Sequence, residues 1–438
     1  MEHKRTAGQF ASSAGFILAA VGSAVGMGNI WLFPYRVGQY GGGAFLVPYF
    51  IFVALFSYVG LSGEFALGRL TGTGTAGSFD YVLRQRGKKG GAIIGILPLL
   101  GVLGIAIGYS VVVGWVLKYA AGAITGSILS GDAQAYFSAM AVDFGSVPWH
   151  LLAVLLTAGV LLLGVKDGIE KISKFMMPAF FILFIIIAIR VAFLPGSGEG
   201  YRYLLTPDWS YLLNFETWVM AMGQAFFSLS INGAGMLIYG SYMKKSEDIV
   251  HHSVMTALLD TAAALLAGFA IIPAVFAFGI APNSGPPLMF VTLPQVFQNM
   301  PMGQLFAILF FVSVFFAGIT PLINIMEACG EALSSRLKLS RRLSVAVVAA
   351  VVFGVAVFLE ALPNMGTWLD TVTIYIATFG ALLCAVFIYF ILGMPAIKKE
   401  LNQGRKKPLG RSFDILAYIY VAVAAAVLVL GIVYGGIG

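Results

Sequence analysis

The sequence predicts an all-α membrane protein with about eleven transmembrane helices, and three observations support this fold class. Hydrophobic residues make up 59% of the chain and charged residues only 10%, too few to cover a soluble protein of this length. Apolar runs of roughly 20 residues, the length of a bilayer-spanning helix, recur along the whole chain. Basic residues cluster at alternate connections between these runs, which is typical of a multi-pass membrane protein.

The predicted spans are taken in chain order. They begin near residues 11, 43, 91, 148, 172, 216, 251, 303, 343, 367 and 413. The first run is long and Gly-rich and has no cleavage site before a soluble domain, so we expect no cleavable signal segment. We expect one membrane domain, 1–438. Within it, spans 1–5 (about 10–195) and 6–10 (about 214–397) form two halves of an inverted repeat, with span 11 (about 412–436) peripheral.

The basic residues predict the orientation. With a cytoplasmic N-terminus, only four of the 26 Lys and Arg residues fall on the outer side: Arg36, Lys118, Arg190 and Arg202. A wrong span count would scatter these clusters over both faces. An odd number of spans then places the C-terminus outside. The net charge of +7 is explained by this bias, and we expect membrane lipid but neither nucleic acid nor an obligate protein as a partner.

Two segments should break their helices at mid-membrane depth. Residues 22–29, GSAVGMGN, lie in span 1, and residues 226–235, FFSLSINGAG, lie in span 6. Each segment alone is also explained by close helix packing, in which small residues are common. The two breaks, however, occupy corresponding places in the two halves, which favours the binding site of a transporter. Broken helices expose N–H groups that suit a carboxylate and carbonyls that suit a cation.

Several motifs resemble those of one family. Residues 28–35, GNIWLFPY, and 41–49, GGGAFLVPY, resemble the signature of the neurotransmitter:sodium symporter family, as do FFSLS at 226–230, YGSY at 239–242 and FFAGIT at 315–320. The match runs in order over essentially the whole chain. It implies a sodium-coupled symporter that imports an amino acid or a related small amine or carboxylate by alternating access. Eleven spans resemble the shorter bacterial branch, which implies a bacterial-type inner membrane.

The resemblance implies two sodium sites. The first would use the Ala24 carbonyl, the side chains of Asn29, Ser228 and Asp260, and the substrate carboxylate. An acid within a span is functional by default, although a structural hydrogen bond to a neighbouring helix would also explain Asp260. Because Asp260 supplies a fixed negative charge and Ala264 occupies the family's usual chloride-binding position, we expect transport without chloride.

The second sodium site would use the carbonyls of Gly22, Val25 and Ala317 and the hydroxyl of Thr320. The family usually has another hydroxyl at the next position, where this chain has Pro321. One ligand is therefore lost, but proline lacks an N–H and frees the carbonyl of Ala317 four residues earlier. We expect this site to persist with altered affinity.

By the same resemblance, the substrate carboxylate would bind the N–H groups of Met27 and Gly28 and the hydroxyl of Tyr109. The carbonyls of Ala24, Phe227 and Ser228, with the Ser230 hydroxyl, would bind its amino group. Phe227 would cover the substrate, and Tyr109 and Phe227 would both belong to the gate. An interfacial anchor for Tyr109 and plain packing for Phe227 are the simpler alternatives.

The side-chain pocket departs from the family, which usually has a bulky residue between two glycines where this chain has NGA at 232–234. Gly233 should remove a wall and Asn232 should add a polar group, while Ile105, Pro321 and Ile325 would provide apolar walls. We therefore expect a larger or polar-decorated amino acid.

The outer gate departs as well. The family's gate arginine is Leu32 here, while its acidic partner remains as Asp370. Arg36 lies one helical turn away, so we expect it to pair with Asp370. Alternatively, Asp370 receives a cationic group of the substrate.

Other classes of function remain open at this point. A sodium-dependent transporter of another organic solute and a solute sensor that does not transport would share these features, and a channel would explain the spans alone. An enzyme is not expected, since the sequence shows no nucleophile–base set, metal-ligand cluster or phosphate loop.

Overall fold

The computed structural model describes residues 8–279 and 285–437, and every regular element in that part of the chain is helical. The α-helices are α1 (Ser13–Ala24), α2 (Phe33–Gln39), α3 (Leu46–Leu55), α4 (Ser62–Thr71), α5 (Thr75–Gln85), α6 (Gly91–Ile94), α7 (Ile96–Thr125), α8 (Ala133–Ser138), α9 (Val147–Leu162), α10 (Lys171–Ala192), α11 (Ser197–Leu205), α12 (Phe215–Ser228), α13 (Gly235–Ser241), α14 (Ile249–Ala277), α15 (Leu293–Asn299), α16 (Gly303–Arg336), α17 (Arg341–Ala356), α18 (Leu362–Thr371), α19 (Thr378–Val386), α20 (Met394–Leu401) and α21 (Arg411–Val433).

Short π- or 3-10-helical segments continue or join these helices. They are η1 (Gly28–Leu32), η2 (Gly42–Phe45), η3 (Phe56–Leu61), η4 (Ser127–Leu129), η5 (Val165–Glu170), η6 (Trp209–Leu213), η7 (Leu288–Thr292), η8 (Val357–Leu359), η9 (Val372–Ala377) and η10 (Phe387–Gly393).

Within the described residues, eight helices are long and apolar enough to cross a bilayer. They are Gly42–Thr71, Gly91–Thr125, Val165–Ala192, Ile249–Ala277, Gly303–Arg336, Arg341–Leu359, Leu362–Leu401 and Arg411–Val433. The pair α1 and α2 makes a ninth candidate, bent by 59° at its break. If the shorter apolar helix α9 and the interrupted pair α12 and α13 each count as one further span, the total is consistent with the predicted eleven.

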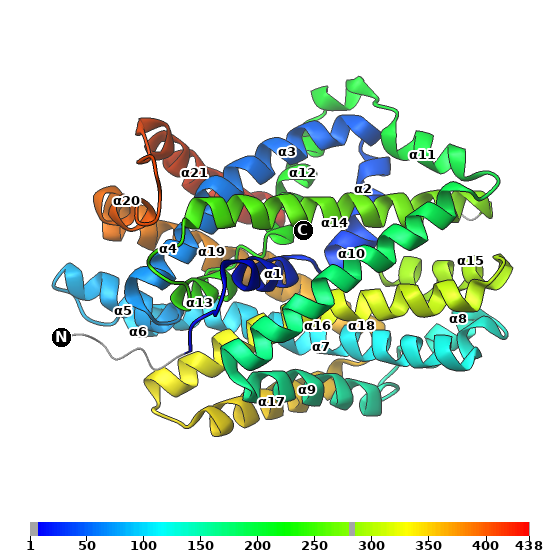
Figure 1. Cartoon of the computed structure of the whole chain (residues 1–438), viewed down its shortest axis with the longest axis horizontal. Helices are drawn as coiled ribbons and strands as arrows, with labels where there is room; N and C mark the ends of the chain where they lie inside the picture. The colour runs from blue at the N-terminus through cyan, green and yellow to red at the C-terminus, as the bar shows by residue number, and fades with distance from the viewer. Residues whose placement is uncertain (1–7, 280–284, 438) are drawn as a thin grey trace.

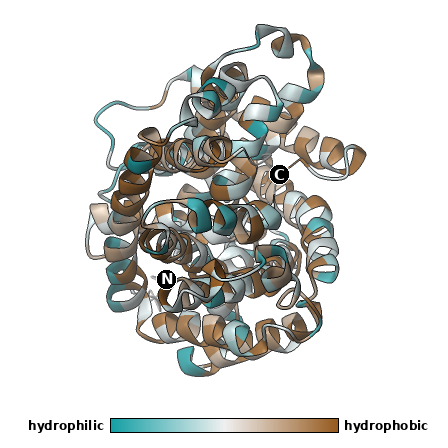
Figure 2. Ribbon diagram, turned by 90° about the vertical axis from the view of Figure 1, so that its right-hand side faces the viewer, coloured by the Kyte–Doolittle hydropathy of each residue, from teal (hydrophilic) through white to brown (hydrophobic). Residues whose placement is uncertain are grey.

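The helices run roughly side by side in one bundle (Figure 1). α7 and α16 pack against one another, and the first half of span 1, α1, packs against α10, α14, α16 and α13. Seen along the helix axes, hydrophobic residues occur throughout the bundle, including the helices at its edge (Figure 2). Large apolar side chains such as Phe193 and Leu155 are exposed at 79% and 56%. A surface of this kind requires lipid as its solvent, so the predicted all-α membrane fold is confirmed.

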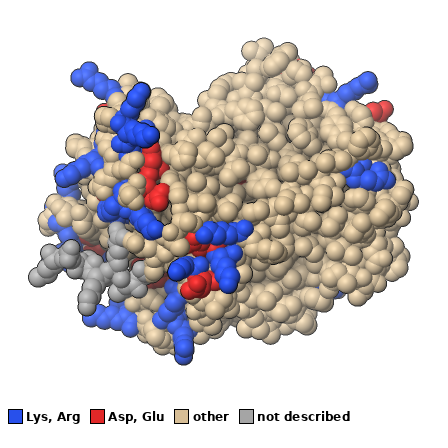
Figure 3. All heavy atoms as spheres, viewed as in Figure 1, with Lys and Arg blue, Asp and Glu red and all other residues tan. Residues whose placement is uncertain are grey.

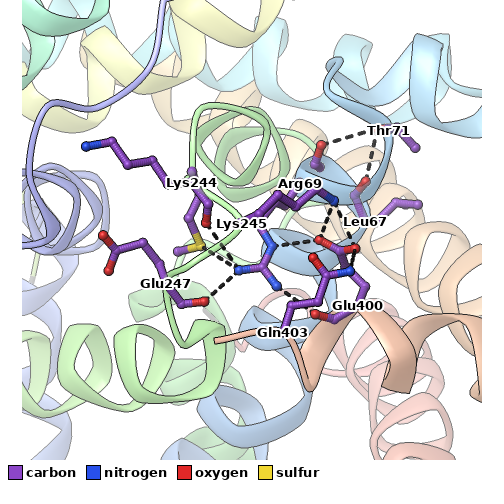
Figure 4. A network of polar contacts seen from close by, with 10 residues as sticks. Leu67, Arg69, Thr71, Lys244, Lys245, Glu247, Glu400 and Gln403 are labelled. Carbon is purple, nitrogen blue, oxygen red and sulfur yellow. Dashed lines mark hydrogen bonds and ion pairs between the residues drawn. The ribbon is translucent and has the colours of Figure 1, made fainter. Parts of the chain in front are cut away.

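Lys and Arg side chains gather at one end of the bundle, over α5, α6 and α20 (Figure 3). At this end Arg69 of α4 is fully buried and ties three separate parts of the chain together (Figure 4). Its guanidinium donates to the Glu400 carboxylate at 2.7 Å and to the Glu247 carbonyl at 2.6 Å. Lys245 donates to the same carboxylate at 2.8 Å. The network joins α4, the segment after α13 and α20.

Candidate functional site

Span 1 is broken where the glycines predicted it. α1 ends at Ala24, Val25 is extended (ψ 111°), and helical structure resumes at Gly28. The Asn29 side-chain oxygen accepts from the Gly26 N–H at 3.0 Å, which caps the start of the second half of span 1. A methyl group on Gly26 would lie 3.3 Å from the Tyr109 hydroxyl and 3.6 Å from Pro321. The break therefore faces α7 and α16.

Span 6 is broken between Ser228 and Gly235. Ser230 and Gly233 both have positive φ, at 52° and 76°, a conformation that a helix cannot contain. The Asn232 side-chain oxygen accepts from the N–H groups of Ala234 (3.0 Å) and Gly235 (2.8 Å) and so begins α13. The predicted discontinuity of both helices is thus confirmed.

The two breaks touch one another. The hydroxyl of Ser230 donates to the Ser23 carbonyl at 2.8 Å. This bond holds Ser230 in its left-handed conformation and leaves its oxygen lone pairs free to accept a hydrogen bond.

The side chains proposed for the first sodium site form one buried cluster. The Asn29 amide donates to the Asp260 carboxylate at 2.8 Å and to the Ser228 hydroxyl at 3.2 Å. Ser228 in turn donates to the other Asp260 oxygen at 2.5 Å. Spans 1, 6 and 7 therefore meet at a single carboxylate.

This cluster suits a small hard cation. The Asp260 side chain is completely buried, and among the described residues no Lys, Arg or His lies within ion-pair distance of it. A buried carboxylate without a counter-charge is costly. Asp260 and Ser228 offer oxygen ligands with one negative charge, which a single monovalent cation would balance. Asn29 presents its NH2 group to the cluster, while its side-chain oxygen faces the Gly26 N–H.

The structure also brings together two residues of the proposed second sodium site. A methyl group on Gly22 would lie 3.1 Å from Cβ and 3.3 Å from the hydroxyl of Thr320, and α1 packs on α16. Thr320 donates to the Phe316 carbonyl at 2.8 Å, which leaves the hydroxyl oxygen available as an acceptor. Val25 and Ala317 are both fully buried.

A cavity of about 360 Å³ lies between the two breaks. It is lined by eleven of the twelve predicted substrate residues: Ala24, Met27, Gly28, Ile105, Tyr109, Phe227, Ser228, Ser230, Asn232, Pro321 and Ile325. The Tyr109 hydroxyl is buried and has no hydrogen-bond partner among the described residues. A buried polar group without a partner in a cavity points to a bound ligand.

One prediction about the side-chain pocket is wrong in this structure. Gly233 does not line the cavity. Its N–H donates to Glu64 at 2.8 Å, and a methyl group on it would meet the Gly380 carbonyl at 2.8 Å. The absence of a side chain at position 233 thus allows close packing on α19 and does not widen the pocket. Asn232 does line the cavity, but its oxygen is already bound to the backbone of α13.

The predicted Arg36–Asp370 pair does not form here. The Arg36 guanidinium is buried and donates to the Ile437 carbonyl at 2.7 Å and to Gln224 at 3.4 Å. Asp370 is exposed and lies at the cavity lining. The reason is that the residues following α21 lie beside α12. There the Ile437 carbonyl accepts the hydrogen bond from the Arg36 guanidinium.

Sequence reasoning missed several residues that shape the site. Glu64 of α4 is buried and accepts from the break in span 6. The rule that singled out Asp260, an acid within a span, applies to Glu64 as well and could have found it. Trp31, Gln224, Leu369 and Thr373 also line the cavity. Trp31 belongs to the GNIWLFPY motif at 28–35, whereas no local motif marks the other three.

Two interrupted helices whose breaks touch one another, beside a cavity and a buried carboxylate without a counter-charge, define a membrane transporter of the sodium-dependent kind. The family model described as the sodium:neurotransmitter symporter family matches residues 7–138 and 136–437. The chain belongs to that family, whose members are transporters, so it is not an enzyme.

Similar proteins agree with this assignment. YhdH of Bacillus subtilis, named as a sodium-dependent transporter, is 39% identical over 73% of this chain and 71% of its own length. A sodium-dependent transporter of Haemophilus influenzae is 32% identical over 89% of this chain and 90% of its own length. The crystal structure of MhsT in complex with L-phenylalanine superimposes with a TM-score of 0.86, at 30% identity, over 97% of this chain and 99% of MhsT.

Proposed function

We propose that the protein imports an amino acid together with sodium by alternating access, without a requirement for chloride. The observation that carries this proposal is the position of the Asn29–Ser228–Asp260 cluster, because Asn29 and Ser228 also line the cavity. An ion in the cluster and a solute in the cavity would therefore be in contact.

The cavity offers separate places for the two ends of an amino acid. The first residues of a helix have N–H groups without intrahelical partners, so Met27 and Gly28 would bind a carboxylate with the free hydroxyl of Tyr109. The carbonyls of Ala24, Phe227 and Ser228, and the oxygen of Ser230, would accept from the amino group. The carboxylate would also complete the first sodium site.

The remaining walls indicate the substrate's side chain. Ile105, Phe227 and Ile325 are apolar, and the cavity is about 360 Å³ in volume. We expect a bulky and mainly apolar amino acid, and the L-phenylalanine named with MhsT supports this class.

Sodium and substrate would each raise the affinity of the other by the same coupling free energy. Asp260 would balance the charge of the first ion, and Ala264, one turn further along α14 and fully buried, offers no side-chain ligand for chloride. We propose a second sodium at Gly22, Val25, Ala317 and Thr320, with an affinity altered by Pro321.

We also propose that the basic end of the bundle faces the cytoplasm (Figure 3), as expected for Lys- and Arg-rich connections. This orientation places the N-terminus inside and the end of α21 outside a bacterial-type inner membrane. The chain would act as a single transporter domain.

The test is a thermal-shift screen of the purified protein with amino acids, with sodium or potassium, followed by uptake of any hit into vesicles. We expect stabilisation only with sodium, and uptake driven by an inward sodium gradient that persists when gluconate replaces chloride. Binding without uptake would indicate a sensor. Single-channel currents would indicate a channel, and uptake that needs chloride would refute the role given to Asp260.

A further inference from the structure

A second concave surface lies on the outside of the bundle, away from the transport cavity. It is a groove of about 420 Å³ between α5 and α6, the start of α7, the end of α16 and α17. Its walls are almost entirely apolar and include Leu99 and Leu103 of α7, Cys329 and Leu333 of α16, and Val348 of α17. We call this surface the α7–α16–α17 groove.

The groove opens toward lipid rather than water. Ile93, Leu100 and Val351 line it and are exposed at 72%, 48% and 40%. They belong to helices that are long and apolar enough to cross a bilayer. A hydrocarbon chain is the occupant that matches such a lining, since a polar ligand would lose its hydrogen bonds there.

One charged side chain, Arg336 at the end of α16, lines the groove. Its guanidinium donates to the Ala76 carbonyl at 2.6 Å and contacts Asp80 at 3.4 Å. Asp80 also pairs with Arg84 at 3.0 Å, so two cations share one carboxylate. A guanidinium has five N–H groups, and these two contacts leave donors available.

The connections next to the helices of the groove add further positive charge. Lys88 and Lys89 precede α6, Lys338 follows α16, and all three are exposed. The other nearby acid, Glu331, packs against Gly74. The rim therefore carries a net positive charge at the end of the bundle where basic residues gather (Figure 3).

We propose that this groove binds an anionic phospholipid of the cytoplasmic leaflet, with one acyl chain in the groove and the phosphate on Arg336. A zwitterionic lipid would fit the same walls, but its ammonium group would face the basic rim. Each Lys or Arg near the surface favours an anionic lipid by about 1 kcal/mol, or roughly fivefold. This inference does not depend on the identity of the transported solute.

The test is native mass spectrometry of the full-length protein extracted from bilayers that contain equal amounts of phosphatidylglycerol and phosphatidylcholine with matched chains. We expect the protein to retain phosphatidylglycerol about fivefold or more over phosphatidylcholine. Arg336→Gln, which keeps a donor for the Ala76 carbonyl, should reduce this preference about fivefold. Arg342→Gln, which removes an exposed charge from α17 outside the groove lining, should leave it unchanged.

A second variant makes the test independent of whether Arg336→Gln folds. Ala332→Trp adds bulk inside the groove without altering the rim and should reduce retention of both lipids. Equal retention of the two lipids by the unchanged protein, or an equal loss with Arg342→Gln, would overturn the proposal. So would a dimer in which the groove is covered by a second copy, or unaltered lipid retention by Ala332→Trp.

Discussion

The amide of Asn29 donates to the carboxylate of Asp260 across 2.8 Å, and so joins the break in span 1 to the middle of span 7. The same amide contacts Ser228 at the edge of the break in span 6. Three helices that are distant in sequence are thus connected through one buried negative charge. An ion bound at this carboxylate would therefore contact both broken helices and alter how their two breaks are held together.

Replacement of Asp260 by Asn should remove the charged ligand of the first sodium site. Because a hydrogen bond or ion contact to a charged group contributes about 1.5–3 kcal/mol, we expect at least a tenfold rise in the sodium concentration that gives half-maximal thermal stabilisation. Asp414→Asn is the control, since Asp414 pairs with Lys398 on the periphery at 2.8 Å. Unchanged sodium titration of Asp260→Asn would contradict the proposed site.

Tyr109→Phe should weaken substrate binding without weakening the fold. The Tyr109 hydroxyl has no partner in the described structure, so its loss costs no protein hydrogen bond, but the KM of uptake should rise about tenfold or more. Tyr119→Phe offers the matched contrast, because the Tyr119 hydroxyl donates to the Phe290 carbonyl at 2.7 Å. It should lower the melting temperature and leave KM nearly unchanged. The opposite pattern would assign Tyr109 a structural role.

Charge reversal tests the outer gate. Since Arg36 binds the Ile437 carbonyl rather than Asp370, we expect uptake by Arg36→Asp to stay low when Asp370→Arg is added. Asp370→Asn alone should leave the melting temperature unchanged because its side chain is exposed. Rescue of uptake in the double variant would show that the two residues pair in another conformation of the transport cycle.

Arg69→Met should be strongly destabilising. It removes the fully buried partner of the Glu400 carboxylate (Figure 4). Lys245 still donates to that carboxylate at 2.8 Å, so we expect a loss of about 3 kcal/mol, the lower end of the range for breaking a buried ion pair. Arg84→Met is the control. The Arg84 side chain is 72% exposed and pairs with Asp80, so its loss should cost at most about 1 kcal/mol. Melting temperatures in one detergent compare the two variants, and equal shifts would argue against the network.

Replacement by alanine should have different effects on stability and uptake at two glycines, because their surroundings differ. Gly68 of α4 lies directly against the backbone of α13 at Leu237 and Ser241, whereas Gly159 of α9 has open space around its Cα. Gly68→Ala should separate α4 from α13 and reduce stability and uptake. Gly159→Ala should be neutral or should stabilise by up to about 1 kcal/mol, since alanine favours helix. Melting temperatures and uptake rates compare the two, and a harmless Gly68→Ala would show that α13 tolerates displacement.

The sequence by itself determined the class of the protein. Its apolar runs predicted the spans, and its glycines with Asn29 and Asn232 located both breaks, because hydropathy and backbone preference are local properties of the chain. The buried cluster of Asn29, Ser228 and Asp260 followed from motif resemblance and is assembled in the structure.

Only the tertiary structure decided where side chains in and near the breaks point. The backbone of Gly233 has a positive φ, packs on α19 and donates its N–H to Glu64, so it lies away from the cavity. Arg36 binds a carbonyl 401 residues away. Outside a regular helix, the direction of a side chain is not set by a period of 3.6 residues. It depends instead on partners that are brought close only when the bundle packs.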